Sequence, residues 1–182
     1  MQDYNILVTF HPNSKAKAEE EIIQRLRDND IPLEDMIESS VSGLVLLRVT
    51  GDGKDAVRKI RAFSIRFPEV FQHTHHWTPV EEWVSSDPEA MIEAARRFGE
   101  RIRDQDRWKM ELHKRHYEGG SNLDLVKMLT EPIDRGIVDL EQPELVLEVD
   151  IISGFAGFSL LSEEERLDIN QVRSLIGLAR IH

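Results

Sequence analysis

The order of hydrophobic patterns along residues 4–76 restricts the fold of this chain more than any other sequence feature. Four short apolar runs are typical of strands, at Tyr4–Phe10, Asp35–Ser39, Leu44–Val49 and Val70–His76. Between the first two runs, and again between the last two, apolar residues recur at three- and four-residue steps. That spacing is typical of a helix packed on one side. The chain is therefore expected to begin strand, helix, strand, strand, helix, strand.

That order is the ferredoxin-like supersecondary plan. Ser14 can cap the first helix, Gly43 suits the turn between the two middle strands, and Pro68 stops the second helix. We therefore predict an α+β protein that opens with a ferredoxin-like domain over residues 1–76.

The second half of the chain predicts a further α/β domain. Asp87 suits a helix N-cap, and an apolar stripe over residues 91–102 marks the helix that follows. Residues 108–113 alternate apolar and polar side chains, as in a half-buried strand. Leu145–Ile152 carries apolar residues on both parities, which indicates a central strand covered on both faces. We place this domain at residues 77–165 and a C-terminal helix at residues 166–182.

Positive charge is concentrated in one segment of an acidic chain. The chain has 23 Lys and Arg against 34 Asp and Glu, a net charge of −11. Between Ala94 and Tyr117, in contrast, eight Lys and Arg face only four acids. A cationic segment against such a background indicates an anionic partner, most often a nucleic-acid backbone.

This segment supplies the candidate RNA-binding residues. The candidates are Arg96, Arg97, Arg103, Arg107, Lys109, His113, Lys114, Arg115, His116 and Tyr117. The rings of His116 and Tyr117, beside Gly119, could stack on an unpaired base. Two simpler interpretations stay open: a solvated helix face whose arginines pair with nearby acids, and a surface turn in which Tyr117 packs on the sheet.

Other chemistry finds little support in the sequence. The chain has no cysteine, which excludes disulfides, thiolate metal sites and cysteine nucleophiles. The histidine run His73–His76 invites a metal, but spacing alone places no acid to complete a set of three or four ligands. We expect ordinary histidines there, and we expect no catalytic residue, no metal and no cofactor.

The second half of the chain resembles THUMP domains, the RNA-binding modules of several tRNA-modifying proteins. Four segments and the arginine-rich helix carry the resemblance; the segments are Trp77–Val84 (WTPVEEWV), Trp108–His116 (WKMELHKRH), Val138–Ile152 and Gly154–Leu161. Their order is more specific than any one of them. The first half is similar to the ferredoxin-like domain that precedes THUMP in such proteins.

Within that family the chain is most similar to the stand-alone branch, the partner proteins of the RNA cytidine acetyltransferase. This resemblance implies that the chain presents tRNA to the acetyltransferase for N4-acetylcytidine formation in the D-arm. Only 21 residues follow Leu161, too few for a catalytic fold, and no glycine-rich strand-to-helix turn offers a nucleotide site. We therefore expect a tRNA-binding adaptor and not an enzyme.

Three functions of other classes remain open. A ferredoxin-like module could sense a small ligand, or the chain could act only through protein contacts, with no RNA role in either case. The third is a residual enzyme, such as a hydrolase that uses the histidines. The N-terminus has neither a basic start nor a long apolar stretch, so we expect no signal peptide, no membrane partner and a cytoplasmic location.

Overall fold

The computed structural model describes residues Met1–His182, which divide into two compact units. The terminal unit comprises Asp3–Val80 together with Glu164–His182. The central unit comprises Glu81–Glu163 together with the first two residues. No helix in either unit combines the length and the apolar character that crossing a membrane requires.

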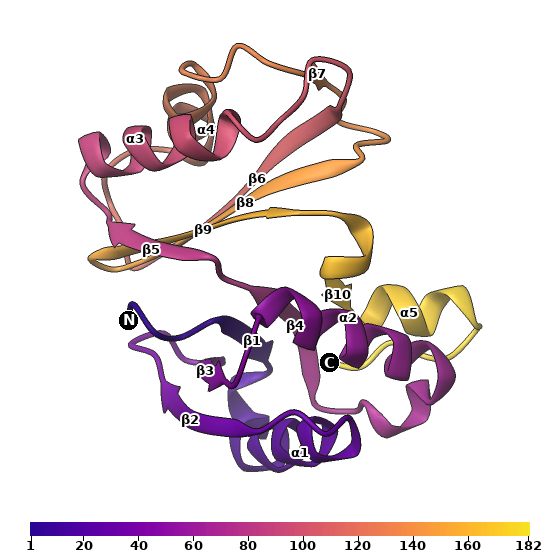
Figure 1. Cartoon of the computed structure of the whole chain (residues 1–182). Coiled ribbons are helices and arrows are strands. Elements are labelled where there is room, and N and C mark those ends of the chain that lie inside the picture. The colour runs from indigo at the N-terminus through magenta and orange to yellow at the C-terminus, as the bar shows by residue number, and fades with distance from the viewer. The chain divides into compact units, whose positions relative to one another are not determined.

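The terminal unit is an antiparallel sheet with helices on one face (Figure 1). Its strands are β1 (Ile6–Phe10), β2 (Leu33–Glu38), β3 (Leu44–Val49), β4 (Thr74–Pro79) and β10 (Leu167–Asp168). Its helices are α1 (Lys15–Asp28), α2 (Gly53–Arg66) and α5 (Ile169–Leu175). The strand order is β10-β4-β1-β3-β2, so Leu167 and Asp168 pair with β4 at one edge of the sheet.

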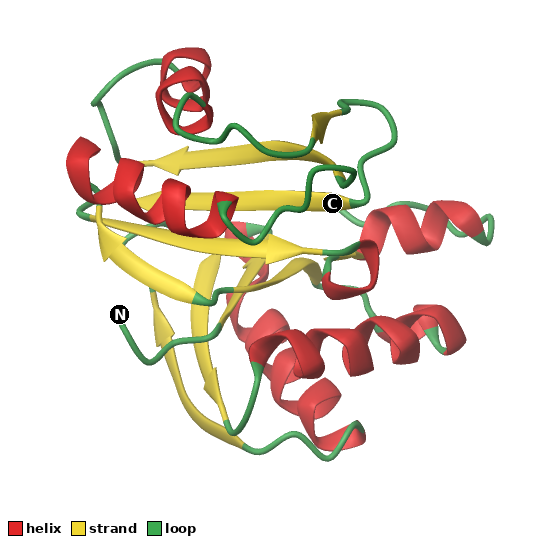
Figure 2. Cartoon of the chain, turned by 45° about the horizontal axis from the view of Figure 1, so that its top comes forward, coloured by secondary structure: helices red, strands yellow, loops and turns green.

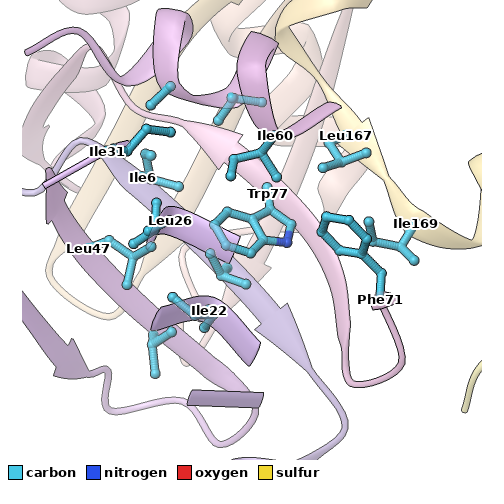
Figure 3. Packing of buried hydrophobic residues seen from close by; sticks show 14 of the residues in the cluster. Ile6, Ile22, Leu26, Ile31, Leu47, Ile60, Phe71, Trp77, Leu167 and Ile169 are labelled. Carbon is cyan, nitrogen blue, oxygen red and sulfur yellow. The ribbon is translucent and has the colours of Figure 1, made fainter. Parts of the chain in front are cut away.

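The core of the terminal unit lies between this sheet and its helices. Trp77 of β4 is fully buried in that cluster, as Figure 3 shows, with Ile22 from α1, Ile60 from α2 and Ile169 from α5. The indole nitrogen of Trp77 donates a hydrogen bond of 3.0 Å to Thr74 Oγ1, which satisfies the polar atom of this large buried ring.

The central unit is a mixed sheet that also carries its helices on one face (Figure 2). Its strands are β5 (Glu82–Ser85), β6 (Arg107–Arg115), β7 (Ile137–Val138), β8 (Leu145–Ile152) and β9 (Phe155–Leu161). Its helices are α3 (Pro88–Gly99) and α4 (Asn122–Thr130). The strand order is β5-β9-β8-β6-β7, with β6 parallel to both β7 and β8.

Strand β8 is the middle of this sheet, as its sequence predicts. Every residue from Val146 to Ile152 is buried. Two of those residues are carboxylates, Glu148 and Asp150. The parallel register places Glu148 opposite Glu111 and Asp150 opposite His113, so that acidic and basic side chains of two strands meet on the face away from α3 and α4.

The structure differs from the sequence-based expectations at the chain's C-terminal end. A 3-10 turn (Glu163–Glu165) and strand β10 replace the start of the expected helix over residues 166–182. Helix α5 is only seven residues long and ends before Gly177, whose φ of +76° is left-handed. This whole segment belongs to the terminal unit.

Three strands also differ from expectation. Strand β4 runs from Thr74 to Pro79, later in the chain than the expected strand Val70–His76, because a 3-10 turn occupies Pro68–Val70. Strands β5 and β7 were not predicted, because four and two residues are too few for a hydrophobic period to show.

Candidate nucleic-acid interface

Strand β6 presents two different faces, because successive side chains of a strand point in opposite directions. Trp108 and Leu112 pack into the core that α3 and α4 complete. The intervening polar residues lie on the opposite face; they are Lys109, Glu111, His113 and Arg115. Lys114 has the parity of the core residues, so the neighbours Lys114 and Arg115 point to opposite faces.

The arginines of α3 are paired with carboxylates of the same unit. Arg96 pairs with Glu93 one turn earlier on the helix. Arg97 pairs with Glu82 of β5, which ties the helix to the edge strand. Both arginine side chains remain about half exposed, at 50% and 45%.

Two further arginines follow α3 and are also paired. Arg101 donates hydrogen bonds of 2.8 and 3.1 Å to the two carboxylate oxygens of Glu81. Arg103 donates from Nη2 to Asp106 Oδ1 at 2.9 Å, and its hydrogen bonds hold the pKa of the Asp106 carboxyl below its ordinary value. The Arg103 side chain is nevertheless 76% exposed.

Arg107, the first residue of β6, lies between two acids of the loop that joins β7 to β8. Its guanidinium lies 3.8 Å from Asp139 Oδ2 and 3.8 Å from Glu144 Oε2. Its backbone N–H donates to the same Glu144 oxygen at 3.0 Å. The two 3.8 Å distances are long for hydrogen bonds between side chains, so the guanidinium of Arg107 is only loosely paired.

The end of β6 is arranged differently from its start. Lys114 Nζ donates to the carbonyl of Gly120 at 2.5 Å. His116 is exposed and adopts a left-handed φ of +52°, which turns the chain out of the strand. Tyr117 packs against the core of the central unit, and its hydroxyl lies where a side chain at Gly119 would be. This packing favours the simpler interpretation of Tyr117 as part of a surface turn.

Two further candidates, His113 and Arg115, meet buried carboxylates on the polar face of β6 and β8, while Lys109 pairs with the half-buried Glu111. His113 Nε2 lies 3.2 Å from Glu148 Oε1, and this hydrogen bond raises the pKa of His113. Arg115 Nη1 lies 2.7 Å from Asp150 Oδ1. Burial, with the neighbouring charge of Glu148, raises the pKa of Asp150 against the opposing effect of Arg115.

Seven of the eight cations between Ala94 and Tyr117 thus have a carboxylate partner within 4.0 Å. Most of these partners lie outside the segment, at Glu81, Glu82, Glu93, Asp139, Glu144 and Asp150. The excess of positive charge along the sequence is therefore largely balanced in space. The role of the ten candidate residues in RNA binding stays a prediction.

Sequence reasoning missed Glu148 and Asp150 as partners of the basic strand. A signal was present, because two acids interrupt the otherwise apolar run Leu145–Ile152. A buried carboxylate requires a partner, and a basic strand in the same domain can supply one.

The histidine run is dispersed in the structure. His73 precedes β4, while the ring of His76 lies 3.4 Å from Asp168 Oδ2 of β10. The Nε2 atom of His75 is buried without a hydrogen-bond partner, and burial lowers the pKa of this ring.

Comparisons with known proteins show the fold of this chain and no more. No protein-family model matches it, and no curated protein sequence does. Among solved structures, PH1313 from Pyrococcus horikoshii OT3 matches with a TM-score of 0.63 over 91% of this chain and 55% of its own, at 13% identity. TrmN from Thermus thermophilus matches with a TM-score of 0.62 over 92% and 47%, at 16% identity. A predicted N6-adenine-specific DNA methylase from Listeria monocytogenes matches with a TM-score of 0.54 over 86% and 40%, at 11% identity.

These matches correct one expectation. The chain spans about half the length of the solved chains that it matches, or less. The expectation of a non-enzyme, drawn from the few residues after Leu161, is wrong, because the fold is shared with chains described as methylases. The chain has the α+β fold of these larger proteins.

Proposed function

We propose that this chain binds tRNA in the cytoplasm and holds it for chemical modification. In this proposal the exposed arginines of α3 and the start of β6 contact RNA phosphates, and Lys114 and His116 extend the surface at the end of β6. The resemblance to THUMP domains supports tRNA as the partner.

The exposure of the paired arginines is the observation that carries the proposal. The side chains of Arg96, Arg97, Arg103 and Arg107 are between 43% and 76% exposed although each has a carboxylate neighbour. Ion pairs at such exposure contribute about 0–1 kcal/mol, because water screens them. A phosphate can therefore replace the carboxylate at little cost, and the cations remain available to RNA.

The first test is tRNA binding at several salt concentrations, measured through the fluorescence anisotropy of a labelled tRNA. Contact with two to four phosphates predicts that log affinity falls with log salt at a slope of roughly −2 to −4. Arg96→Ala combined with Lys114→Ala should weaken binding by about tenfold, since two of these contacts are lost.

A matched control removes the same charge elsewhere. Lys17 and Lys59 are exposed on α1 and α2 of the terminal unit. The double variant Lys17→Ala with Lys59→Ala should bind tRNA within about twofold of the unchanged chain, because neither residue belongs to the proposed surface. Equal losses in the two double variants, or no loss in either, would refute the assignment.

We further propose that the modification is N4-acetylcytidine formation in the D-arm, with an RNA cytidine acetyltransferase as the catalytic partner. The resemblance to the stand-alone THUMP branch supports this finer proposal. Ile137, Val138 and Leu140, at the edge of the central unit, are 55%, 64% and 73% exposed. Adjacent exposed apolar side chains are typical of a surface that contacts another protein.

This partner is tested by reconstitution. Acetylcytidine in the D-arm is quantified by mass spectrometry after incubation of tRNA and the acetyltransferase with and without the chain. Val138→Ser combined with Leu140→Ser should remove the stimulation and leave tRNA affinity unchanged. No stimulation by the unchanged chain would exclude the acetyltransferase and leave the tRNA proposal standing.

We also propose that the terminal unit is a ferredoxin-like domain extended by one strand. Its antiparallel order β4-β1-β3-β2, with α1 and α2 packed on the sheet, supports this proposal, and β10 is the addition beyond β4. An experimental structure with a different strand order would contradict it.

A further inference from the structure

Three ligand-type side chains converge on the polar face of β6 and β8. Glu111 and His113 are two residues apart on β6, and Glu148 lies beside them on the parallel strand β8. One donor atom from each of the three lies within 4.8 Å of the other two. The register of β6 with β8 produces this convergence.

The donor set and its spacing suit a divalent transition metal. Imidazole nitrogen and carboxylate oxygen bind Zn²⁺ at about 2.0–2.2 Å, so two ligands of one ion lie roughly 3–3.5 Å apart. The distance of 3.2 Å between His113 Nε2 and Glu148 Oε1 falls in that range. Small side-chain movements would bring the Glu111 carboxylate to the same ion.

The charges around the cluster are paired across the two strands. Glu148 and Asp150 are both buried, at 6% and 3% exposure, and they share one face of β8. Lys109 Nζ lies 2.6 Å from Glu111 Oε1, and Arg115 Nη1 lies 2.7 Å from Asp150 Oδ1. A divalent ion bound by His113 and Glu148 would take the place of a proton on the His113 ring, and the two glutamates would balance its charge.

We propose that Glu111, His113 and Glu148 form a binding site for a divalent transition-metal ion, with Zn²⁺ as the representative. Two carboxylates and one imidazole leave at least one coordination position for water or another oxygen ligand. Such an ion would join β6 to β8. Its positive charge would allow the polar face of these strands to accept an anion. The inference concerns a site beyond the proposed tRNA contacts and does not depend on them.

Zinc binding to the full chain tests the proposal. The protein is stripped of metal with a chelator, and Zn²⁺ is titrated in competition with a chromophoric indicator. The unchanged chain is expected to bind one equivalent with a Kd of about 10 µM or tighter. His113→Gln should weaken that affinity at least tenfold, because it removes the nitrogen ligand.

His116→Gln is the matched control, since His116 is an exposed histidine of the same unit that lies outside the cluster. It should bind zinc within twofold of the unchanged chain. Glu111→Gln provides a second ligand variant if His113→Gln does not fold, and it should also weaken binding at least tenfold.

Cobalt gives a second readout, because its absorption reports the ligands that surround the ion. Co²⁺ in a site of four or five ligands absorbs in the visible region, and this absorption should be present in His116→Gln and absent in His113→Gln. The proposal is overturned if the unchanged chain binds Zn²⁺ more weakly than about 100 µM. It is also overturned if both ligand variants bind as tightly as the control.

Discussion

The guanidinium of Arg115 lies 2.7 Å from the carboxylate of Asp150, and this pair joins the end of β6 to the buried strand β8. The Asp150 side chain is 4% exposed and that of Arg115 is 24% exposed. The contact therefore differs from the exposed pairs of α3. The carboxylate of Asp150 has lost most of its contact with water, and its charge depends on Arg115 for compensation.

Replacing Arg115 by Ala is expected to destabilise the protein by about 2–4 kcal/mol, because it leaves a buried carboxylate without its cation. The free energy of unfolding in urea measures this loss. Arg96→Ala, which breaks an exposed pair, should cost less than about 1 kcal/mol. An Arg115→Ala protein of unchanged stability that binds tRNA poorly would show that Arg115 acts on RNA and not on the fold.

A second prediction concerns the buried carboxylate of Glu21 on α1. It accepts hydrogen bonds from the backbone N–H groups of Gln72, His73 and Thr74 at 2.7, 2.9 and 3.0 Å, and from the Thr74 hydroxyl at 2.7 Å. Glu21→Gln removes the charge and one acceptor oxygen, so we expect a loss of about 1–3 kcal/mol in unfolding free energy.

The neighbouring residue offers the control for this variant. Glu20 is exposed on the same helix, and Glu20→Gln should change stability by less than about 0.5 kcal/mol. Thermal and urea unfolding of the two variants would be compared side by side. Equal stabilities would mean that the Glu21 hydrogen bonds contribute nothing net.

The third prediction is a pH dependence of stability that originates at His75. Burial is the main cause that lowers the pKa of this ring in the folded chain, and the nearby His76 lowers it further. The unfolded chain then binds the proton more readily, so stability is lost as pH falls below about 6.5, the ordinary histidine pKa.

Urea unfolding at pH 7, 6 and 5 measures this effect against a His75→Gln variant, which has no ring to titrate. The stability difference between pH 7 and pH 5 should be smaller in the variant. The comparison isolates His75 from His113, whose raised pKa contributes in the opposite direction. Parallel profiles for the two proteins would contradict the prediction.

The fourth prediction concerns Gly136, just before β7. Its φ is +75°, and an added Cβ would lie 2.6 Å from Ile102 Cγ2 and 2.7 Å from Trp108 Cδ1. Gly136→Ala should cost about 2–4 kcal/mol through backbone strain and overpacking. A Cβ added at Gly154 would have open space around it. The unfolding free energy of Gly154→Ala, measured by calorimetry, should therefore be within about 0.5 kcal/mol of that of the unchanged chain.

Much of the local structure could be predicted from the sequence. Strand β8 has the predicted bounds, Leu145–Ile152, because its apolar run ends at the turn that Ser153 and Gly154 form. Ser121, a residue type that favours the start of a helix, caps α4 by accepting a hydrogen bond from the Asp124 N–H at 3.1 Å. These features depend on residues close together in the chain.

The candidate site was less predictable, because charge pairing depends on tertiary register. Arg97 meets Glu82 fifteen residues away, and Arg115 meets Asp150 thirty-five residues away. No periodicity in the sequence reports such distances. Counting charges along the segment therefore overestimated its free positive charge.

The pairing of Leu167 and Asp168 with Trp77 and His76 has a consequence for biosynthesis. The terminal unit combines Asp3–Val80 with Glu164–His182, so its first segment leaves the ribosome well before the strand that covers the β4 edge. Until Leu167 and Asp168 have been made, that edge carries unsatisfied backbone groups open to other nascent chains. Loss of β10 would then prolong this vulnerable state of the unit.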